Sequence, residues 1–460
     1  MRAAALLGAN LLMLVAGLGV LPLLGVARSW RALVQRSALA YFSGILLAGI
    51  VSADLALVHV SFGWIGLAAL AALGLGLCFW RLRGTDRPGL APRPAVHDVV
   101  ALVALLAVFV DYARAFRVAP LNRYDAWAIW ALKGHALYAF GWADPVLFAG
   151  SAYHFANLDY PLLLPSLEAI DFRSMGAFDT RLLHVQFLLL LVAALLALFA
   201  LLRDRAHPVV LWLTLLAVAL APAVFDQLLT AYADLPLALV FAVGVAAAAR
   251  WLVTDERWAL AFATFCFGGA LLLKNEGSLF VLAVFVALFA AAHNRWRAVA
   301  VAGAVDLVLL APWRIYVRVH DLQDINYSLG DSFDLGHVHG RLGVGPIAFR
   351  TLAGEMLDPR QWGLLVLIFL ALVVAAVVTG LRALPVFAAI WTVLAWLGLS
   401  WIYVISHYEY SSYLDSTKER VIASIVLGSA ALVPLLAGET WTRFSARAPG
   451  RLRTGDESTP

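Results

Sequence analysis

The sequence predicts an all-helical integral membrane protein with about thirteen transmembrane helices. Of its 460 residues, 63% are hydrophobic and 13% are charged, and the mean hydropathy is +0.87. Soluble domains average about 45–50% apolar and about 25% charged residues, so this chain has too little charge to cover a water-facing surface of its size. Soluble enzymes and nucleic-acid-binding proteins are therefore excluded, despite a pI of about 9.1.

Apolar stretches long enough to cross the hydrocarbon core follow one another along the whole chain. The first is longer than the apolar part of a secretory signal, so we expect it to be a retained helix. Cys78 and Cys266 lie inside such stretches, which favours structural roles for both thiols. The expected spans are residues 3–26, 38–60, 62–80, 99–116, 182–202, 209–224, 236–252, 258–273, 278–292, 298–317, 362–380, 383–405 and 421–436.

The basic residues indicate which way the chain crosses the membrane. Of the 33 lysines and arginines, 18 lie in alternate loops, starting with the loop after the first span. The positive-inside rule makes these loops cytoplasmic, with the N-terminus outside and the C-terminus inside. Two long segments, 117–181 and 318–361, are then outside, and long loops in compact proteins are usually functional.

The same pattern divides the chain into five parts. We expect three N-terminal helices and a cytoplasmic loop in residues 1–98. A membrane core follows in residues 99–317 and includes the outer loop 117–181. The second outer loop spans residues 318–361, the C-terminal helices residues 362–437, and a disordered cytoplasmic tail residues 438–460.

The first outer loop opens with an acid and an aromatic helical pattern. Trp127, Trp130 and Tyr138 share one helical face by their spacing. We expect an interfacial helix there, on the outer leaflet, with Lys133 on a different face. Asp125 precedes the first turn of this helix. It either caps the free N–H groups or acts as a general base at the membrane surface.

Polar residues farther along the same loop suggest a sugar-binding surface. Asp159 lies next to Tyr160, and His154 precedes them. A carboxylate beside an aromatic ring can hydrogen-bond sugar hydroxyls while the ring stacks on a sugar face. The apolar stretch 162–167, bounded by prolines, is expected to re-enter the interface.

Two further polar sites lie at the outer ends of apolar spans. Asp234, followed by Pro236, either caps a helix or faces substrate. Lys274 and Glu276 occupy a tight turn between two spans, where exposure to lipid would be costly, so we expect them to face a cavity. The ammonium of Lys274 suits a phosphate oxygen, and a lysine paired locally with Glu276 is the alternative.

The remaining polar positions carry weaker signals. Tyr410 belongs to a polar, aromatic segment before the last span, and we expect it to contact an acceptor or headgroup. Asp54 and Asp306 lie deep in apolar spans, so they should face protein or a cavity. A solvated loop explains the second outer loop better than a metal site does. Its polar residues are Asp331, Asp334, His337 and His339.

The order of these motifs resembles the GT-C membrane glycosyltransferases, in particular the bacterial branch related to the lipid A aminoarabinose transferase and the protein O-mannosyltransferases. The family's outer-loop catalytic acid corresponds to Asp125. Its Lys-Pro-Pro-Leu segment corresponds to residues 159–162, its Asp-x-Pro-Leu segment to 234–237, and its lysine turn to 272–275. The resemblance covers roughly residues 99–285.

The resemblance implies a GT-C fold and a location in the bacterial inner membrane. It implies inverting transfer of a sugar from a polyprenyl-phosphate donor to a hydroxyl of a lipid, glycan or protein acceptor, with Asp125 as the base. The lysine of Lys-Pro-Pro is missing here, so the donor phosphate would contact Lys274, Arg123 or Arg314 instead. No cofactor is expected. Ala126 follows Asp125 where the family often has a second acid, so a divalent metal is not supported.

Three other classes of function stay open at this stage. A polymerase or ligase of envelope polysaccharide would also act outside and would use the loop 318–361. A transporter of polyprenyl-linked glycans would need charged residues along a path through the bilayer. A non-catalytic scaffold would explain the helices but not the repeated carboxylates at the outer face.

Overall fold

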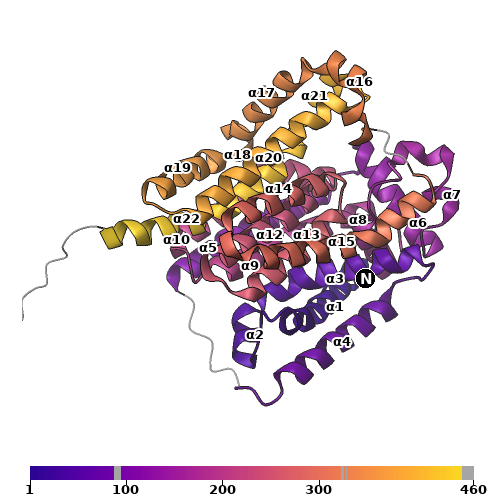
Figure 1. Ribbon diagram of the computed structural model, residues 1–460. Coiled ribbons are helices and arrows are strands. Elements are labelled where there is room, and N and C mark those ends of the chain that lie inside the picture. The colour runs from indigo at the N-terminus through magenta and orange to yellow at the C-terminus, as the bar shows by residue number, and fades with distance from the viewer. Residues whose placement is uncertain (87–94, 323–325, 328, 448–460) are drawn as a thin grey trace, which may run out of the picture.

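A computed structural model describes residues 1–86, 95–322, 326–327 and 329–447 (Figure 1). These residues form helices and connections without any strand, which confirms the all-helical class. The α-helices are α1 Arg2–Leu23, α2 Trp30–Arg36, α3 Ala38–Leu57, α4 Trp64–Leu82, α5 Val96–Phe116, α6 Ala131–Phe140, α7 Pro145–Phe148, α8 Leu163–Met175, α9 Thr180–Leu202, α10 Pro208–Leu220, α11 Pro222–Thr230, α12 Asp234–Thr254, α13 Arg257–Leu271, α14 Glu276–Ala291, α15 Trp296–Val319, α16 Leu335–Arg341, α17 Val344–Leu357, α18 Pro359–Trp362, α19 Leu365–Val378, α20 Ala383–Ile405, α21 Tyr410–Val421 and α22 Ala423–Arg447. A π-helical turn, η1 Ala126–Trp130, precedes α6, and three 3-10 turns are η2 Ser151–Ala156, η3 His293–Arg295 and η4 Leu329–Phe333.

Nine helices of the described chain are long and apolar enough to cross a membrane, which confirms the polytopic membrane class. The pair α10 and α11 passes the same test together but is bent by 48°. The bend follows from Pro222, because the residue before a proline avoids the helical conformation. Three shorter apolar helices, α13, α14 and α19, complete the set. Each expected span coincides with one of these elements, and thirteen crossings stays a prediction.

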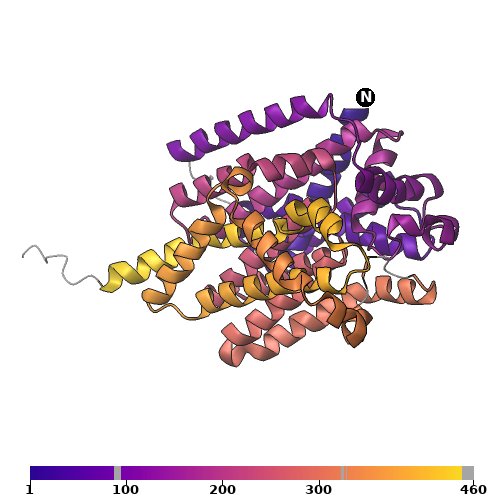
Figure 2. The ribbon, with the colours of Figure 1, turned by 90° about the horizontal axis from the view of Figure 1, so that it is seen from above.

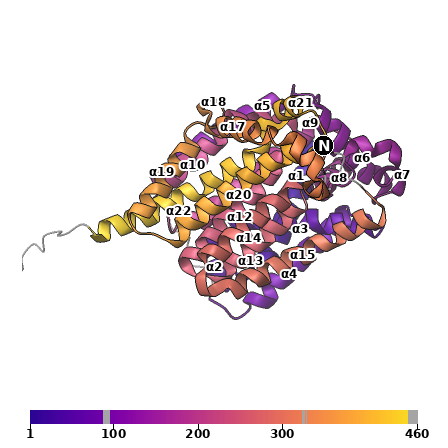
Figure 3. The same cartoon turned by 45° about the horizontal axis from the view of Figure 1, so that its top comes forward.

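The helices lie side by side in a bundle whose most buried member is α12 (Figure 3). This helix contacts α9, α13, α14, α20 and α22. Its apolar window is 89% buried, whereas that of α5 is 22% buried. Figure 2 shows α5, in violet, along one edge of the bundle. The position of α12 at the centre fixes its first residue, Asp234, among the surrounding helices.

The first helix is held by direct backbone contact with its neighbours. A Cβ at Gly17 would lie 1.8 Å from the carbonyl oxygen of Ala40, and one at Gly44 would lie 1.7 Å from that of Met13. Small residues allow helices in membranes to approach this closely. α1 and α3 are therefore packed with their backbones in close contact.

The loop between α5 and α9 is largely helical and lies at one end of the bundle. It contains η1, α6, α7, η2 and α8, and Figure 1 shows α6, α7 and α8 at the same end as the N-terminus. An ion pair of 3.2 Å between Arg2 and Asp179 ties the two together. We call this end the outer end, following the predicted orientation, and the opposite end the inner end.

The C-terminal tail differs from the expectation. Residues 438–447 continue α22 instead of being disordered. Residues 438–447 contain no proline, so the helix that begins in the apolar span can extend into polar sequence. Residues 448–460 lie outside the described part of the chain.

Candidate functional site

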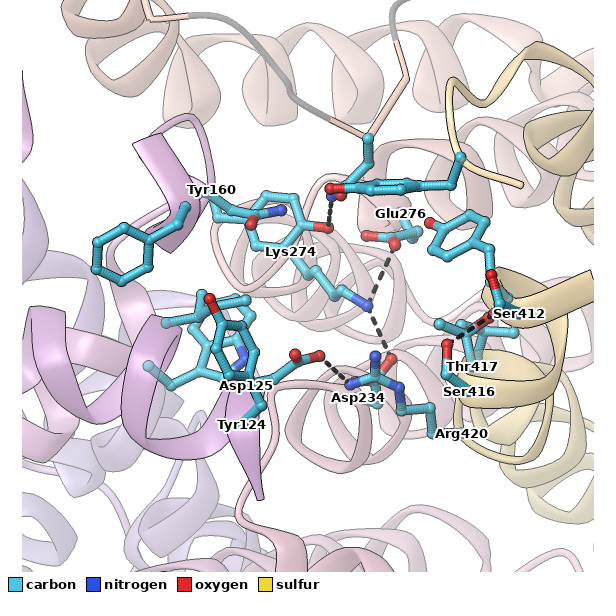
Figure 4. A pocket seen from close by; sticks show the side chains of 18 residues that line it. Tyr124, Asp125, Tyr160, Asp234, Lys274, Glu276, Ser412, Ser416, Thr417 and Arg420 are labelled. Atoms are coloured by element: carbon cyan, nitrogen blue, oxygen red, sulfur yellow. Dashed lines mark hydrogen bonds and ion pairs between the residues drawn. The ribbon is translucent and has the colours of Figure 1, made fainter. Parts of the chain in front are cut away.

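A cavity of about 420 Å³ opens at the outer end between the first outer loop and α21 (Figure 4). Its lining residues lie in several segments that are far apart in the sequence. They are Tyr124, Asp125, Ile129, Trp130, Phe155, Asn157, Tyr160, Asp234, Lys274, Glu276, Asn326, Tyr408, Ser412, Tyr413, Ser416, Thr417, Arg420 and Val421.

Five charged side chains in this cavity form a continuous network of ion pairs. Lys274 Nζ lies 2.9 Å from Asp234 Oδ1 and 3.1 Å from Glu276 Oε1. Arg420 Nη1 lies 2.5 Å from Asp125 Oδ2 and 3.7 Å from Asp234 Oδ2. Asp234 therefore connects the two cations, and Figure 4 shows the whole network across the floor of the cavity.

Local structure explains why these side chains meet. Asp234 is the first residue of α12, where the helix dipole favours a carboxylate. Lys274 lies in the short connection between α13 and α14. Gly277 permits that tight turn, because a Cβ there would lie 2.2 Å from the carbonyl oxygen of Ala270. Arg420 lies in the last turn of α21.

Helix α21 is capped at its start by Glu409, whose carboxylate accepts hydrogen bonds from the backbone N–H groups of Ser411 and Ser412. The bonds from Ser412 and Ser411 hold the pKa of Glu409 at about 2. The cap is therefore ionised at neutral pH and fixes the helix that carries Arg420.

Burial separates the network into an inner and an accessible part. The side chains of Asp234, Lys274 and Glu276 are 4%, 7% and 7% exposed, whereas Asp125 is 25% exposed. Burial alone would lower the pKa of Lys274, but the charges of Asp234 and Glu276 outweigh it and raise that pKa. Lys274 is thus a cation whose charge two carboxylates neutralise, and Asp125 is the acid that a ligand can reach.

An aromatic wall faces these charges. The rings of Trp130 and Tyr160 stack with centroids 5.5 Å apart and an interplanar angle of 20°. Lys133 Nζ lies 4.9 Å from the Trp130 ring and donates to the carbonyl oxygen of Asn157. Asn326 donates a hydrogen bond to the Tyr160 hydroxyl. The wall is therefore held rigidly from behind.

The ammonium of Lys133 is fully buried behind this wall. Burial lowers its pKa to about 7, although the nearby Asp159 and Glu168 act in the opposite direction. Burial likewise raises the pKa of Asp159 to about 6, against the charge of Lys133 and a hydrogen bond of 2.5 Å from Asn275 Nδ2. Asp159 supports the wall from behind instead of lining the cavity.

The structure brings most of the predicted site residues together. Asp125, Tyr160, Asp234, Lys274 and Glu276 line one cavity, and Asp159 lies directly behind it.

Three predicted binding residues, His154, Arg314 and Tyr410, do not line the cavity. His154 is exposed on η2, and Tyr410 is the half-buried first residue of α21. Arg314 is exposed on α15, with Nη2 3.5 Å from Asn275 Oδ1. Phe155, next to His154, and Tyr408 and Ser412, on either side of Tyr410, do line the cavity.

The capping alternatives for the two aspartates are wrong. Asp125 makes no capping hydrogen bond, because its carboxylate pairs with Arg420. Asp234 is not a cap either: Ala233 precedes the helix, and the Asp234 side chain binds Lys274. The expected local pairing of Lys274 with Glu276 is confirmed.

Two cations of the site, Arg420 and Lys133, received no specific role from the sequence. Arg420 belongs to the polar segment before the last span, but no pattern separates it from Lys418 beside it. Lys133 was expected on a different face from Trp130, yet the two contact each other. Their i, i+3 spacing was the available signal, since residues three apart are neighbours on a helix surface.

A divalent metal does not fit the residues of this site. The carboxylates of Asp125, Asp234 and Glu276 are each bound to Arg420 or Lys274. Among the described residues, no three His, Cys, Asp or Glu side chains lie in an arrangement that could hold an ion. In the second outer loop, Asp331 pairs with His407 at 3.0 Å.

Of the two intramembrane acids, Asp306 is buried and Asp54 is half-buried. The expectation that both face protein or a cavity therefore holds for Asp306 and only in part for Asp54.

Comparisons of the chain with protein-family models, with curated proteins and with solved structures found no match.

Proposed function

We propose that the protein is a membrane glycosyltransferase that moves a sugar from a polyprenyl-phosphate donor to an acceptor hydroxyl at the outer face of the membrane. The observation that carries this proposal is the cavity in which Asp125 is the most exposed carboxylate of the network and in which the stacked rings of Trp130 and Tyr160 also form part of the lining. Aromatic rings and carboxylates together suit a sugar, and the position at the ends of apolar helices suits a donor with a lipid tail.

In the proposed reaction, Asp125 accepts the proton of the acceptor hydroxyl while its oxygen attacks the anomeric carbon of the donor sugar. The new bond joins that oxygen to the anomeric carbon, and the bond from this carbon to the phosphate oxygen breaks. The lipid phosphate leaves with the electron pair. One displacement of this kind inverts the anomeric configuration.

Arg420 is better placed than Lys274 to hold the phosphate. Each of these cations pairs with two carboxylates, but Arg420 is 16% exposed and Lys274 only 7%. A guanidinium has five N–H donors, and Arg420 Nε has no hydrogen-bond partner among the described residues. A donor phosphate bound to Arg420 would weaken its hold on Asp125 and leave that carboxylate free to accept the proton.

The experiment that tests the proposal uses the full chain in proteoliposomes with a panel of polyprenyl-phosphate sugars, and measures release of the lipid phosphate. General-base catalysis contributes about 10²–10⁴-fold. Asp125→Asn should therefore reduce turnover by about this factor in a folded protein.

Asp144→Asn is the matched control. Asp144 is an acid of the same outer loop that caps α7, and asparagine caps a helix equally well. Turnover of this variant should equal that of the wild type. Full activity of Asp125→Asn, or no release of lipid phosphate from any donor by folded protein, would reject the proposal.

A further inference from the structure

A second cavity at the outer end lies on the other side of Arg420. It has a volume of about 340 Å³, within the usual range of ligand pockets. Its wall comes from α11, from the start of the first outer loop and from α21. The side chains that matter for its chemistry are Arg123, Asp226, Gln227, Ser416, Glu419 and Arg420.

The two cavities share a wall. Arg420 and Ser416 line both of them. Arg123 lines the second cavity, while Tyr124 and Asp125, the next residues, line the first. The guanidinium of Arg420 lies 4.5 Å from the ring centroid of Tyr232, which also lines the second cavity. A ligand in the second cavity is therefore separated from the proposed base by one side chain and its ion pair.

The charges of the second cavity select the class of ligand. Asp226, Asp415 and Glu419 outnumber Arg123 and Arg420. Moreover, Arg420 is already bound to Asp125 and Asp234 on its other side. The excess of carboxylates repels an anionic group, while carboxylates, Ser416 and amide groups all bind hydroxyls.

Gln227 provides an independent sign of a polar ligand. Its side chain is 3% exposed, and neither its amide nitrogen nor its amide oxygen has a hydrogen-bond partner among the described residues. An unpaired buried polar group costs about 1–3 kcal/mol. Gln227 lines the second cavity, so a ligand there that donates and accepts hydrogen bonds would supply partners for its amide group.

We propose that the second cavity binds the acceptor, and that the bound group is an uncharged, polyhydroxylated sugar. This inference rests on the proposed function. The sugar presents one hydroxyl past Arg420 to Asp125, which takes its proton while the oxygen forms the bond to the donor sugar. Two cavities that meet at Arg420 keep donor and acceptor apart until this side chain moves.

Ligand binding without any donor tests the assignment. Saturation-transfer NMR on the full chain in nanodiscs, with maltotriose, glucose and glucose 6-phosphate as probes, should show the two neutral sugars binding and the phosphate excluded. Gln227→Leu should weaken maltotriose binding by about 2–10-fold, as the loss of one hydrogen bond does. An alkyl maltoside compared with free maltotriose distinguishes a glycolipid acceptor from a soluble glycan.

Two further variants control this result. Gln186→Leu removes another buried amide, 5% exposed and outside both cavities, and should leave sugar binding unchanged. Asp226→Asn combined with Glu419→Gln removes two exposed negative charges and should admit glucose 6-phosphate.

These measurements test the acceptor site and the transfer reaction separately. The assignment is wrong if no neutral sugar binds, if Gln227→Leu binds maltotriose as the wild type does, or if the wild type binds glucose 6-phosphate equally well. Release of lipid phosphate without sugar binding would reject this inference alone. Sugar binding without any donor turnover would retain the cavity and reject the transfer reaction.

Discussion

The two ends of the helix bundle both carry networks of ion pairs, but the networks are built differently. At the inner end, Arg250 binds Asp204 through two nitrogens at 2.5 and 2.8 Å, binds Glu256 at 2.7 Å and donates to the carbonyl oxygen of Leu201. Its guanidinium lies 5.0 Å from the ring centroid of Trp258. The donors of this arginine are occupied by the protein.

The outer network leaves polar atoms unoccupied beside a cavity. Glu276 Oε2 and Arg420 Nε have no hydrogen-bond partner among the described residues, and Asp234 Oδ2 has only its 3.7 Å ion pair with Arg420. Buried polar groups are normally paired, so such atoms need an explanation. The comparison indicates that the inner network stabilises the connections between helices, whereas the outer one is arranged for a ligand.

Removing Lys274, the more buried cation of the outer network, should lower the stability of the protein more than the matching change at the inner end does. Lys274→Met leaves Glu276 without its partner and Asp234 with only the 3.7 Å pair to Arg420, and both carboxylates are under 10% exposed. Breaking a buried ion pair in this way costs about 3–5 kcal/mol. We expect a large fall in Tm in thermal unfolding. A Tm equal to that of the wild type would show that the outer carboxylates are not held by Lys274.

The matching change at the inner end should cost less. Arg250→Met leaves Asp204 and Glu256, which are 53% and 31% exposed and can be hydrated. We expect a loss of about 1.5–3 kcal/mol, the value of hydrogen bonds to charged groups. In the same thermal unfolding experiment, a larger fall in Tm for Arg250→Met than for Lys274→Met would reverse the comparison.

The two ends should also respond oppositely to pH. Burial raises the pKa of Glu168 and Asp171 in α8 well above their usual values. For Asp204 and Glu256, burial acts in the same direction, but the hydrogen bonds and charge of Arg250 outweigh it and lower both pKa values. Stability from the inner pair is thus present above about pH 4 and lost as the pH falls below it, while stability from the α8 acids falls as the pH rises above about 4.

Hydrogen exchange, corrected for intrinsic rates, measures this difference between pH 5 and 8. Protection of α8 should decrease with pH, by at most about 1.4 kcal/mol per pH unit for each acid, while protection of residues 201–206 stays constant. Glu168→Gln should reduce the slope in α8. Protection of α8 that rises with pH would contradict the assignment.

The smallest effect is expected from Asp204→Asn. The carboxylate of Asp204 is 53% exposed, and exposed ion pairs contribute about 0–1 kcal/mol. Donor turnover should stay within about twofold of the wild type, in contrast to Asp125→Asn. A large loss of turnover in this variant would mean that the inner network takes part in the reaction.

The sequence predicted the structure best where burial in lipid or protein restricts which residue types can occur. Apolar stretches predicted the helices, and polar groups between spans predicted that Lys274 and Glu276 face a cavity, because lipid would not accept them. The bend between α10 and α11 and the helical start of the tail were not predicted, since both depend on local backbone preferences at a few residues.

Side-chain direction was the main limit at the site. His154 and Tyr410 flank segments that reach the cavity, yet their own side chains do not line it. Arg420 joins Asp125 only through tertiary packing, and no spacing rule relates two residues so far apart. Lys133 contacts Trp130, three residues before it, so the i, i+3 spacing predicts its position better than the separate helical face assigned to it.

The ion pair between Asp125 and Arg420 can form only late in the synthesis of the chain. About 300 residues separate the two partners in the sequence. At synthesis rates of about 5–20 residues per second, roughly 15–60 s pass between the appearance of the acid and that of its arginine. During this time Asp125 is present without the arginine that it pairs with and without α21, which supplies part of the cavity lining. The proposed transfer reaction, which uses this cavity, can therefore start only after α21 has been made.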